Sequence, residues 1–142
     1  MAGKPRAVLD TNVFVSGLIN PKGAPAAILR DLRSKRFILV SSPPINEEII
    51  GVLNRPYIRD RSGLGNGIFD VSFILWELAE LVIDLPAVKV SSDPDDDKFL
   101  ATADAGRADY LVTGDAGDLL RLHKYKDVAI ISPREFASVL KR

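Results

Sequence analysis

The sequence predicts an α/β fold, a three-layer α/β/α sandwich in which helices cover both faces of a central, mainly parallel sheet. Three observations predict it. Short apolar runs typical of buried strands alternate with longer segments of helical periodicity. Prolines stand where several of these helices would begin. The chain has 142 residues, of which 46% are hydrophobic, and this suits a single domain over residues 1–142.

The first half of the chain alternates strand and helix twice. The apolar run at 7–9 is expected to form the first strand, and a loop follows it. Pro25 suits the first turn of the first helix. A second strand is expected at 37–40, and the helix after it begins at Pro43 and stops near Pro56. Strands separated by helices in this way favour a parallel sheet.

The second half continues the alternation after a glycine-rich break. The elements expected there are a flexible connection at 63–67, an apolar helix at 69–82, a short strand at 88–90, a helix from about 94 to 106, strands at 110–112 and 128–131, and a last helix opened by a capping box at 132–135. In such sheets, ligands bind beyond the carboxyl ends of the strands. Side chains that directly follow the strands are therefore the first candidates for a functional site.

Composition excludes several kinds of chemistry. The chain has no cysteine, so disulfides, thiolate zinc sites and cysteine nucleophiles are excluded. A single histidine, His123, argues against a histidine-rich metal site. A bound metal would be held mainly by oxygen, which favours Mg²⁺ or Mn²⁺. With 19 basic and 19 acidic residues the formal charge is zero, so a nucleic-acid partner would need local basic patches.

No segment is expected to cross a membrane. The most apolar stretch, 68–85, is interrupted by Asp70, Glu77, Glu80 and Asp84. No apolar signal-like region precedes the first acidic residue. A soluble, cytoplasmic protein is the expectation.

Four acidic residues occupy apolar or strand-end positions. Asp10 ends the first apolar run and Asp115 follows a later one. Glu48 borders the apolar face of its helix, and Asp96 precedes inward positions of another helix by three and four residues. The neighbouring Asp97 is interpreted as a surface charge that favours the helix N-terminus.

These carboxylates come from four elements that a doubly wound sheet would bring to one edge. Holding a carboxylate in an apolar setting costs several kcal/mol unless something pairs with it, and grouped carboxylates also repel one another. A divalent cation would relieve both effects. Bound Mg²⁺ or Mn²⁺ can activate water and offset charge on a phosphate, which suits phosphodiester hydrolysis.

Four sequence blocks resemble a known family. They are Val8–Val13, Glu48–Pro56, Asp93–Ala101 and Tyr110–Asp115. In this order they resemble the PIN-domain ribonucleases, and most of all the VapC-type toxins of toxin–antitoxin pairs. The resemblance covers roughly 6–140. It implies a metal-dependent endoribonuclease that acts on RNA, forms homodimers and is inhibited by a small antitoxin protein.

The resemblance also implies roles for particular residues. The catalytic and metal-binding set would be Asp10, Glu48, Asp96 and Asp115, with Asp118 as a further metal ligand and with Asn12 and Thr113 as supporting residues that orient carboxylates or water. The family branch more often has asparagine where this chain has Asp97. That extra charge could alter metal affinity without removing a ligand.

Two cations are candidates for binding the substrate backbone. Lys98 and Arg107 share a predicted helix with Asp96, and Arg107 falls on the same side of it. The apolar helix at 69–82 has two interpretations. It is either a core helix or a partly exposed face for dimerisation or antitoxin binding.

Two other functions compete with the ribonuclease hypothesis. One is a haloacid-dehalogenase-type phosphatase with Asp10 as nucleophile. Asn12 argues against it, because that mechanism needs a second aspartate at this position. The other is a non-catalytic scaffold that binds RNA or protein. An intact acidic set argues against the scaffold.

Overall fold

The computed structural model describes residues 3–61, 64–89, 93–114 and 118–141. The strands are β1 (Arg6–Leu9), β2 (Ile38–Ser41), β3 (Glu80–Leu81), β4 (Tyr110–Val112), β5 (Lys124–Tyr125) and β6 (Val128–Ile131). The helices are α1 (Thr11–Ile19), α2 (Ala24–Arg33), α3 (Pro43–Leu53), α4 (Pro56–Arg59), α5 (Leu64–Phe73), the π-helical turn η1 (Ile74–Leu78), α6 (Pro94–Ala105), α7 (Asp118–Leu122) and α8 (Pro133–Leu140).

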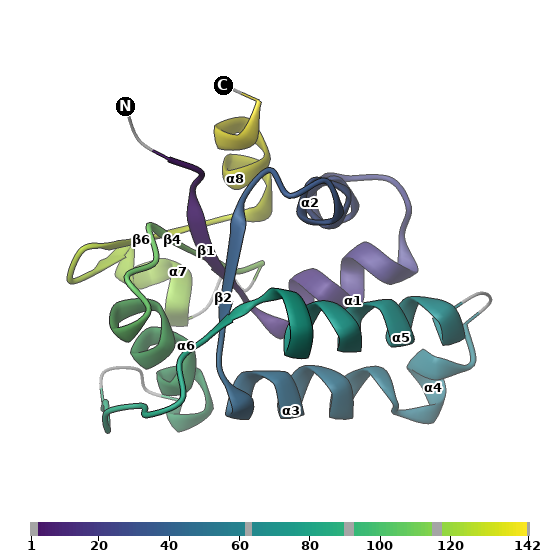
Figure 1. The fold of residues 1–142 in the computed structure, drawn as a ribbon, viewed down its shortest axis with the longest axis horizontal. Coiled ribbons are helices and arrows are strands. Elements are labelled where there is room, and N and C mark those ends of the chain that lie inside the picture. Colours follow the sequence, from purple (N-terminus) through teal and green to yellow (C-terminus); the bar gives the residue numbers. More distant parts are fainter. Residues whose placement is uncertain (1–2, 62–63, 90–92, 115–117, 142) are drawn as a thin grey trace.

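The strands form one sheet in the order β3-β2-β1-β4-β6-β5. All neighbours pair in parallel except β5, which runs antiparallel to β6. Helices α6 and α7 lie on one side of the sheet, and α1 and α5 lie on the other (Figure 1). The predicted three-layer α/β/α architecture is therefore confirmed.

Strand β1 lies in the middle of the sheet and is buried on both faces. Ala7, Val8 and Leu9 are each at most 1% exposed. Its register places Leu9 opposite Val112 of β4, and the next backbone N–H, that of Asp10, donates to the carbonyl of Val112 at 2.9 Å. Because β1 and β4 are parallel and end at the same level, the residues that follow them meet at one edge of the sheet. This carboxyl edge carries the candidate site.

Several helices begin at the residues where local capping signals in the sequence predict a helix start. Pro43 opens α3 and Pro133 opens α8. Ser132 and Glu135 form both hydrogen bonds of the predicted capping box. The last helix then packs through Phe136, whose ring meets that of Phe37 edge to face at 5.0 Å.

Helix α1 occupies the segment after Asp10, where the sequence predicts a loop. Thr11 and Asn12 are ordinary turn residues, and Asp10 makes no side-chain cap on this helix. The helix forms because its burial outweighs these local preferences. Val13 is 1% exposed and Phe14 is fully buried.

The predictions for 63–90 are wrong in three places. The connection expected at 63–67 is already helical from Leu64, and the apolar helix ends at Leu78 rather than Val82. The third strand is Glu80–Leu81 rather than 88–90, where Val88 forms no strand and Val90 lies outside the described residues. The helix closes in a π-helical turn, where the Ala79 N–H donates to the carbonyl of Ile74 at 2.9 Å. The carbonyl of Leu75 in that turn also accepts a hydrogen bond from Asn46 Nδ2 at 3.0 Å.

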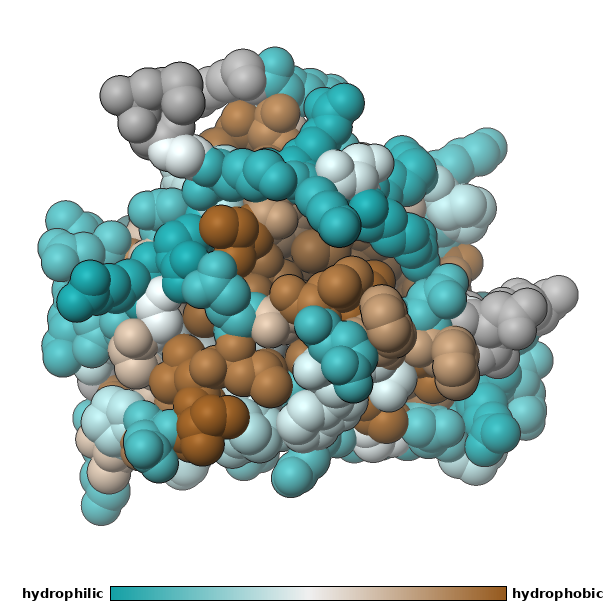
Figure 2. Space-filling model, in the orientation of Figure 1, coloured by the Kyte–Doolittle hydropathy of each residue, from teal (hydrophilic) through white to brown (hydrophobic). Residues whose placement is uncertain are grey.

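The apolar helix fits both of its interpretations. Val71 and Leu75 are at most 1% exposed and belong to the core, whereas Phe69, Phe73 and Leu78 are 75%, 52% and 51% exposed. Apolar atoms gather over α5 and η1 in the space-filling view (Figure 2). We call Phe69, Phe73, Trp76 and Leu78 the apolar face.

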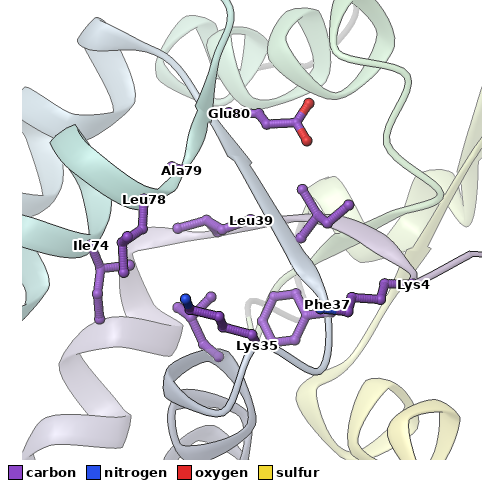
Figure 3. A pocket seen from close by; sticks show the side chains of 10 residues that line it. Lys4, Lys35, Phe37, Leu39, Ile74, Leu78, Ala79 and Glu80 are labelled. Carbon is purple, nitrogen blue, oxygen red and sulfur yellow. The ribbon is translucent and has the colours of Figure 1, made fainter.

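A cavity of about 280 Å³ opens beside the apolar face. Ile74 and Leu78 line one side of it, and Phe37 and Leu39 of the β2 region line another (Figure 3). Lys35 and Glu80 bring opposite charges to the same cavity. In the part of the chain that the structure describes, no helix is long and apolar enough to span a bilayer.

Candidate acidic active site

Asp10 lies directly after β1 at the carboxyl edge of the sheet. It is only 7% exposed. The hydroxyl of Thr113, which follows β4 and is fully buried, donates to Asp10 Oδ2 at 2.7 Å. A hydroxyl is a neutral donor, so it orients this carboxylate without cancelling its charge. Thr113 thus contacts Asp10, one of the carboxylates of the candidate site.

Glu48 lies half-buried on α3, at the border of the apolar helix face, and Glu47 beside it is exposed. The hydroxyl of Thr11 donates to Glu48 Oε2. The ammonium of Lys98 lies 2.5 Å from Glu48 Oε1. The two oxygens of Glu48 therefore contact donors from the first residue of α1 and from the first turns of α6.

These two contacts bring three acidic segments together. Thr11 directly follows Asp10, and Lys98 directly follows Asp97. By holding Glu48 from both sides, they draw the end of β1, helix α3 and the start of α6 to the same edge. The contact of Thr11 with Glu48 has no counterpart among the sequence predictions, although the place of Thr11 next to the strand-end aspartate is a usable signal.

The burial order of Asp96 and Asp97 is the reverse of the prediction. Asp97 is 9% exposed and counts among the buried residues, whereas Asp96 is only half-buried. The expectation that Asp97 is a surface charge is therefore wrong. The physical reason is that α6 is buried around most of its circumference, so its apolar residues do not define a single inward direction. Asp93 caps the helix, accepting from the Asp95 N–H at 3.0 Å.

The structure describes only some of the remaining predicted site residues. Asp115 lies outside the described residues, and Asp118 opens α7, with its side chain outside the described part. Asn12 is exposed and lines a cavity of about 230 Å³ together with Gly114. Asn12 thus shares this cavity with the residue that precedes Asp115 in the sequence.

Arg107 does not lie at this edge, which corrects its predicted role near the acidic residues. It lines a cavity with Arg6, and the guanidinium of Arg6 donates to the carbonyl of Gly106 at 2.8 Å. Arg6 opens β1, whereas Asp10 follows its end. Helix α6 has 12 residues and is therefore about 18 Å long, so it carries its two ends to opposite edges of the sheet.

The donor chemistry fits a hard divalent cation. The described side chains at this edge offer carboxylate and hydroxyl oxygens, the ligands that Mg²⁺ and Mn²⁺ prefer. Within the described ranges, however, no three acidic or histidine side chains form a group that could hold an ion. Asp10, Glu48 and Asp97 would thus hold a metal only together with further ligands or after Glu48 leaves its present contacts.

Replacing Thr113 with valine is expected to destabilise the protein by about 1–2 kcal/mol, because the buried Asp10 carboxylate loses a hydrogen-bond donor and the shape barely changes. Urea unfolding followed by circular dichroism would measure this loss. Thr113→Ser keeps the hydroxyl and should lose less. Equal stability of Thr113→Val and the wild type would show that the hydrogen bond contributes nothing.

Comparison with known proteins places this arrangement in a family. Residues 6–117 match the family model of the PIN domain. An uncharacterised protein of Methanocaldococcus jannaschii is 33% identical over 141 residues, which cover 94% of this chain and 90% of the relative.

Two solved structures share the fold at low sequence identity. One is VapBC2 from Rickettsia felis bound to a DNA fragment from its promoter, with a TM-score of 0.57, 14% identity, and coverage of 89% of this chain and 98% of that one. The other is Mycobacterium tuberculosis VapC20, described as a sarcin-ricin loop cleaving toxin, with a TM-score of 0.56, 12% identity, and coverage of 87% and 98%. With the family match over 6–117 and the acidic residues at the carboxyl edge of the sheet, the chain belongs to the PIN domain family.

Proposed function

We propose that this chain is a Mg²⁺- or Mn²⁺-dependent endoribonuclease and the toxin component of a toxin–antitoxin pair. The observation that carries the proposal is the convergence at Glu48, where Thr11 and Lys98 bring the segments of Asp10 and Asp97 to one edge of the sheet. Membership of the PIN family supports it. The fold that the chain shares with VapC20, a toxin that cleaves the sarcin-ricin loop, supports it as well.

We propose the metal ligands from the sequence blocks of the family and from the burial of the described carboxylates. Asp10 and Glu48 are the first two, and Asp115 is the expected ligand after β4. Burial favours Asp97 over Asp96 as the ligand from α6, with Asp96 as the second candidate. Asp118 is proposed as an additional ligand.

Besides supplying the ligands, the protein is proposed to hold the carboxylate oxygens in place. When bound, Mg²⁺ or Mn²⁺ supplies activation of water and offsets negative charge on the phosphate. Thr113 orients Asp10, and Thr11 orients Glu48. Asn12 is proposed to orient a carboxylate or water near Gly114. Lys98 is the nearby cation suited to contact the phosphate of an RNA strand.

The apolar face gives the proposed partners a place to bind. Phe69, Phe73 and Leu78 are each more than half exposed, and such a patch commonly marks a protein interface. We propose that it is covered by a small antitoxin or by a second copy of the chain in a homodimer. The protein is proposed to act in the cytoplasm, where RNA and an antitoxin would meet it.

A cleavage assay on a mixed pool of RNA tests the proposed activity. Purified protein should cut the RNA when Mg²⁺ or Mn²⁺ is present, and EDTA should abolish the cutting, because the acidic residues would lose the ion that activates water. Adding Mn²⁺ in excess over EDTA should restore it. Cutting that persists in EDTA would contradict the proposal, and so would the absence of cutting with both metals.

Metal binding can be tested separately from cleavage. A ligand held by the native state raises stability. The melting temperature should therefore rise with added Mn²⁺. A melting temperature indifferent to both ions would instead favour a non-catalytic scaffold.

A further inference from the structure

Lys98 forms an ion pair with Glu48 in the candidate site. Its ammonium lies 2.5 Å from Glu48 Oε1, and its side chain is 22% exposed. The side chain of Glu48 is 29% exposed, and its other oxygen accepts from the hydroxyl of Thr11. Each oxygen of this proposed metal ligand therefore already contacts a donor of the chain itself.

This ion pair differs from a comparable one at the other end of α6. Lys126 pairs with Asp104 at 3.2 Å, and the Lys126 side chain is 58% exposed. The hydrogen bond to Asp104 raises the pKa of Lys126. Lys98 is closer to its carboxylate and better shielded from water, and its ammonium lies 5.6 Å from the centroid of the Phe99 ring. Partial burial strengthens the attraction between the two charges.

Lys98 and a metal ion would compete for the same oxygen. A lysine ammonium and a divalent cation both neutralise a carboxylate, but they cannot approach Glu48 Oε1 in the same place. Lysine is a compact charge on a flexible stem, so it can leave one partner and reach another nearby. Lys98 directly follows Asp97 in α6, so its backbone stays in the acidic segment when its ammonium leaves Glu48.

We propose that Lys98 is an exchangeable counter-ion of Glu48. It neutralises Glu48 when no metal is bound, yields that oxygen when Mg²⁺ or Mn²⁺ binds, and is then free to contact the phosphate of the substrate. This inference rests on the proposed function and assigns a regulatory role to a residue of the same site. It implies that Lys98 weakens metal binding and strengthens substrate binding.

The opposite signs of these two effects make the proposal testable. The Kd of the purified full chain for Mn²⁺ alone would be measured by isothermal titration calorimetry. Lys98→Met should bind Mn²⁺ at least about threefold more tightly than the wild type, because Glu48 is no longer paired. At saturating Mn²⁺ the same variant should cleave RNA with a raised KM, because the phosphate contact is lost.

Two further variants separate this role from a general loss of charge or of fold. Lys126→Met removes a lysine from the other ion pair and should leave both the Mn²⁺ affinity and the KM unchanged. Lys98→Arg keeps the positive charge and should retain a Kd within about twofold of the wild type. The Lys98→Arg variant also tests the proposal if Lys98→Met does not fold. A loss of Mn²⁺ binding in folded Lys98→Arg would overturn the proposal.

The outcomes distinguish this inference from the proposed function. If the wild type binds Mn²⁺ and cuts RNA but Lys98→Met binds Mn²⁺ with equal or weaker affinity, the counter-ion role is overturned and the nuclease stands. If the wild type neither binds Mn²⁺ nor cuts RNA, both proposals are overturned. Tighter Mn²⁺ binding together with a higher KM in Lys98→Met supports both.

Discussion

Asp10→Asn is expected to reduce RNA cleavage by at least about a hundredfold while leaving the protein folded. Asp10 is 7% exposed at the carboxyl edge of the sheet, and Thr113 holds one of its oxygens at 2.7 Å. Asparagine has nearly the same shape and offers an oxygen to the Thr113 hydroxyl. It lacks the negative charge that would hold a divalent cation, and losing such a preorganised charge typically costs two or more orders of magnitude in rate.

The measurement is the initial rate of RNA cleavage at saturating Mn²⁺, with circular dichroism and thermal melting as checks on the fold. Asp127→Asn is a matched control, because Asp127 is exposed and lines a cavity with Pro5, before the start of β1. This control should retain the wild-type rate. Cleavage by Asp10→Asn within tenfold of the wild type would remove Asp10 from the proposed site.

Asp97→Asn is the second substitution with a large expected effect, and it should reduce cleavage by at least about a hundredfold. Asp97 is buried at 9% exposure, and its neighbour Lys98 contacts Glu48. Asp96→Asn changes the adjacent, half-buried carboxylate in the same helical turn. It should reduce the rate by less than about tenfold, because a more exposed charge contributes less to binding an ion.

Comparing these two variants decides which carboxylate of α6 serves the site. Both remove one charge from the first turn of the helix, so their effects on helix stability should be similar. The difference between their cleavage rates, and between their affinities for Mn²⁺, therefore reports on the site. A larger loss in Asp96→Asn than in Asp97→Asn would restore the assignment that the sequence pattern favoured.

The fold was predictable from sequence wherever local signals and burial agree. Pro43 and the capping box at Ser132 mark the helix starts that the structure has. The fully apolar run before Asp10 forms a central parallel strand. Prediction failed at Thr11, where turn-forming residues begin a helix because Val13 and Phe14 are buried behind them.

The outermost strand, β3, is a second element that local sequence signals do not predict. Glu80 and Leu81 continue an apolar helical pattern, so their sequence favours a longer helix. The structure ends the helix at Leu78 and pairs these two residues with Val40 and Ser41 of β2. An edge strand of two residues carries too short a pattern to be recognised without its partner strand.

For the site, the sequence by itself determined that Asp10 and Thr113 follow strands of a parallel sheet and that Glu48 borders the apolar face of its helix. Parallel pairing follows from alternating strands and helices, and it brings strand-end residues to one edge. The tertiary structure alone decided that Thr11 and Lys98 hold Glu48, that Asp97 is more buried than Asp96, and that Arg107 lies at the opposite edge. The reason is physical: periodicity and capping are encoded locally, whereas contacts between elements depend on strand register, helix length and the rotation of each helix about its axis, which the packing of the whole chain sets.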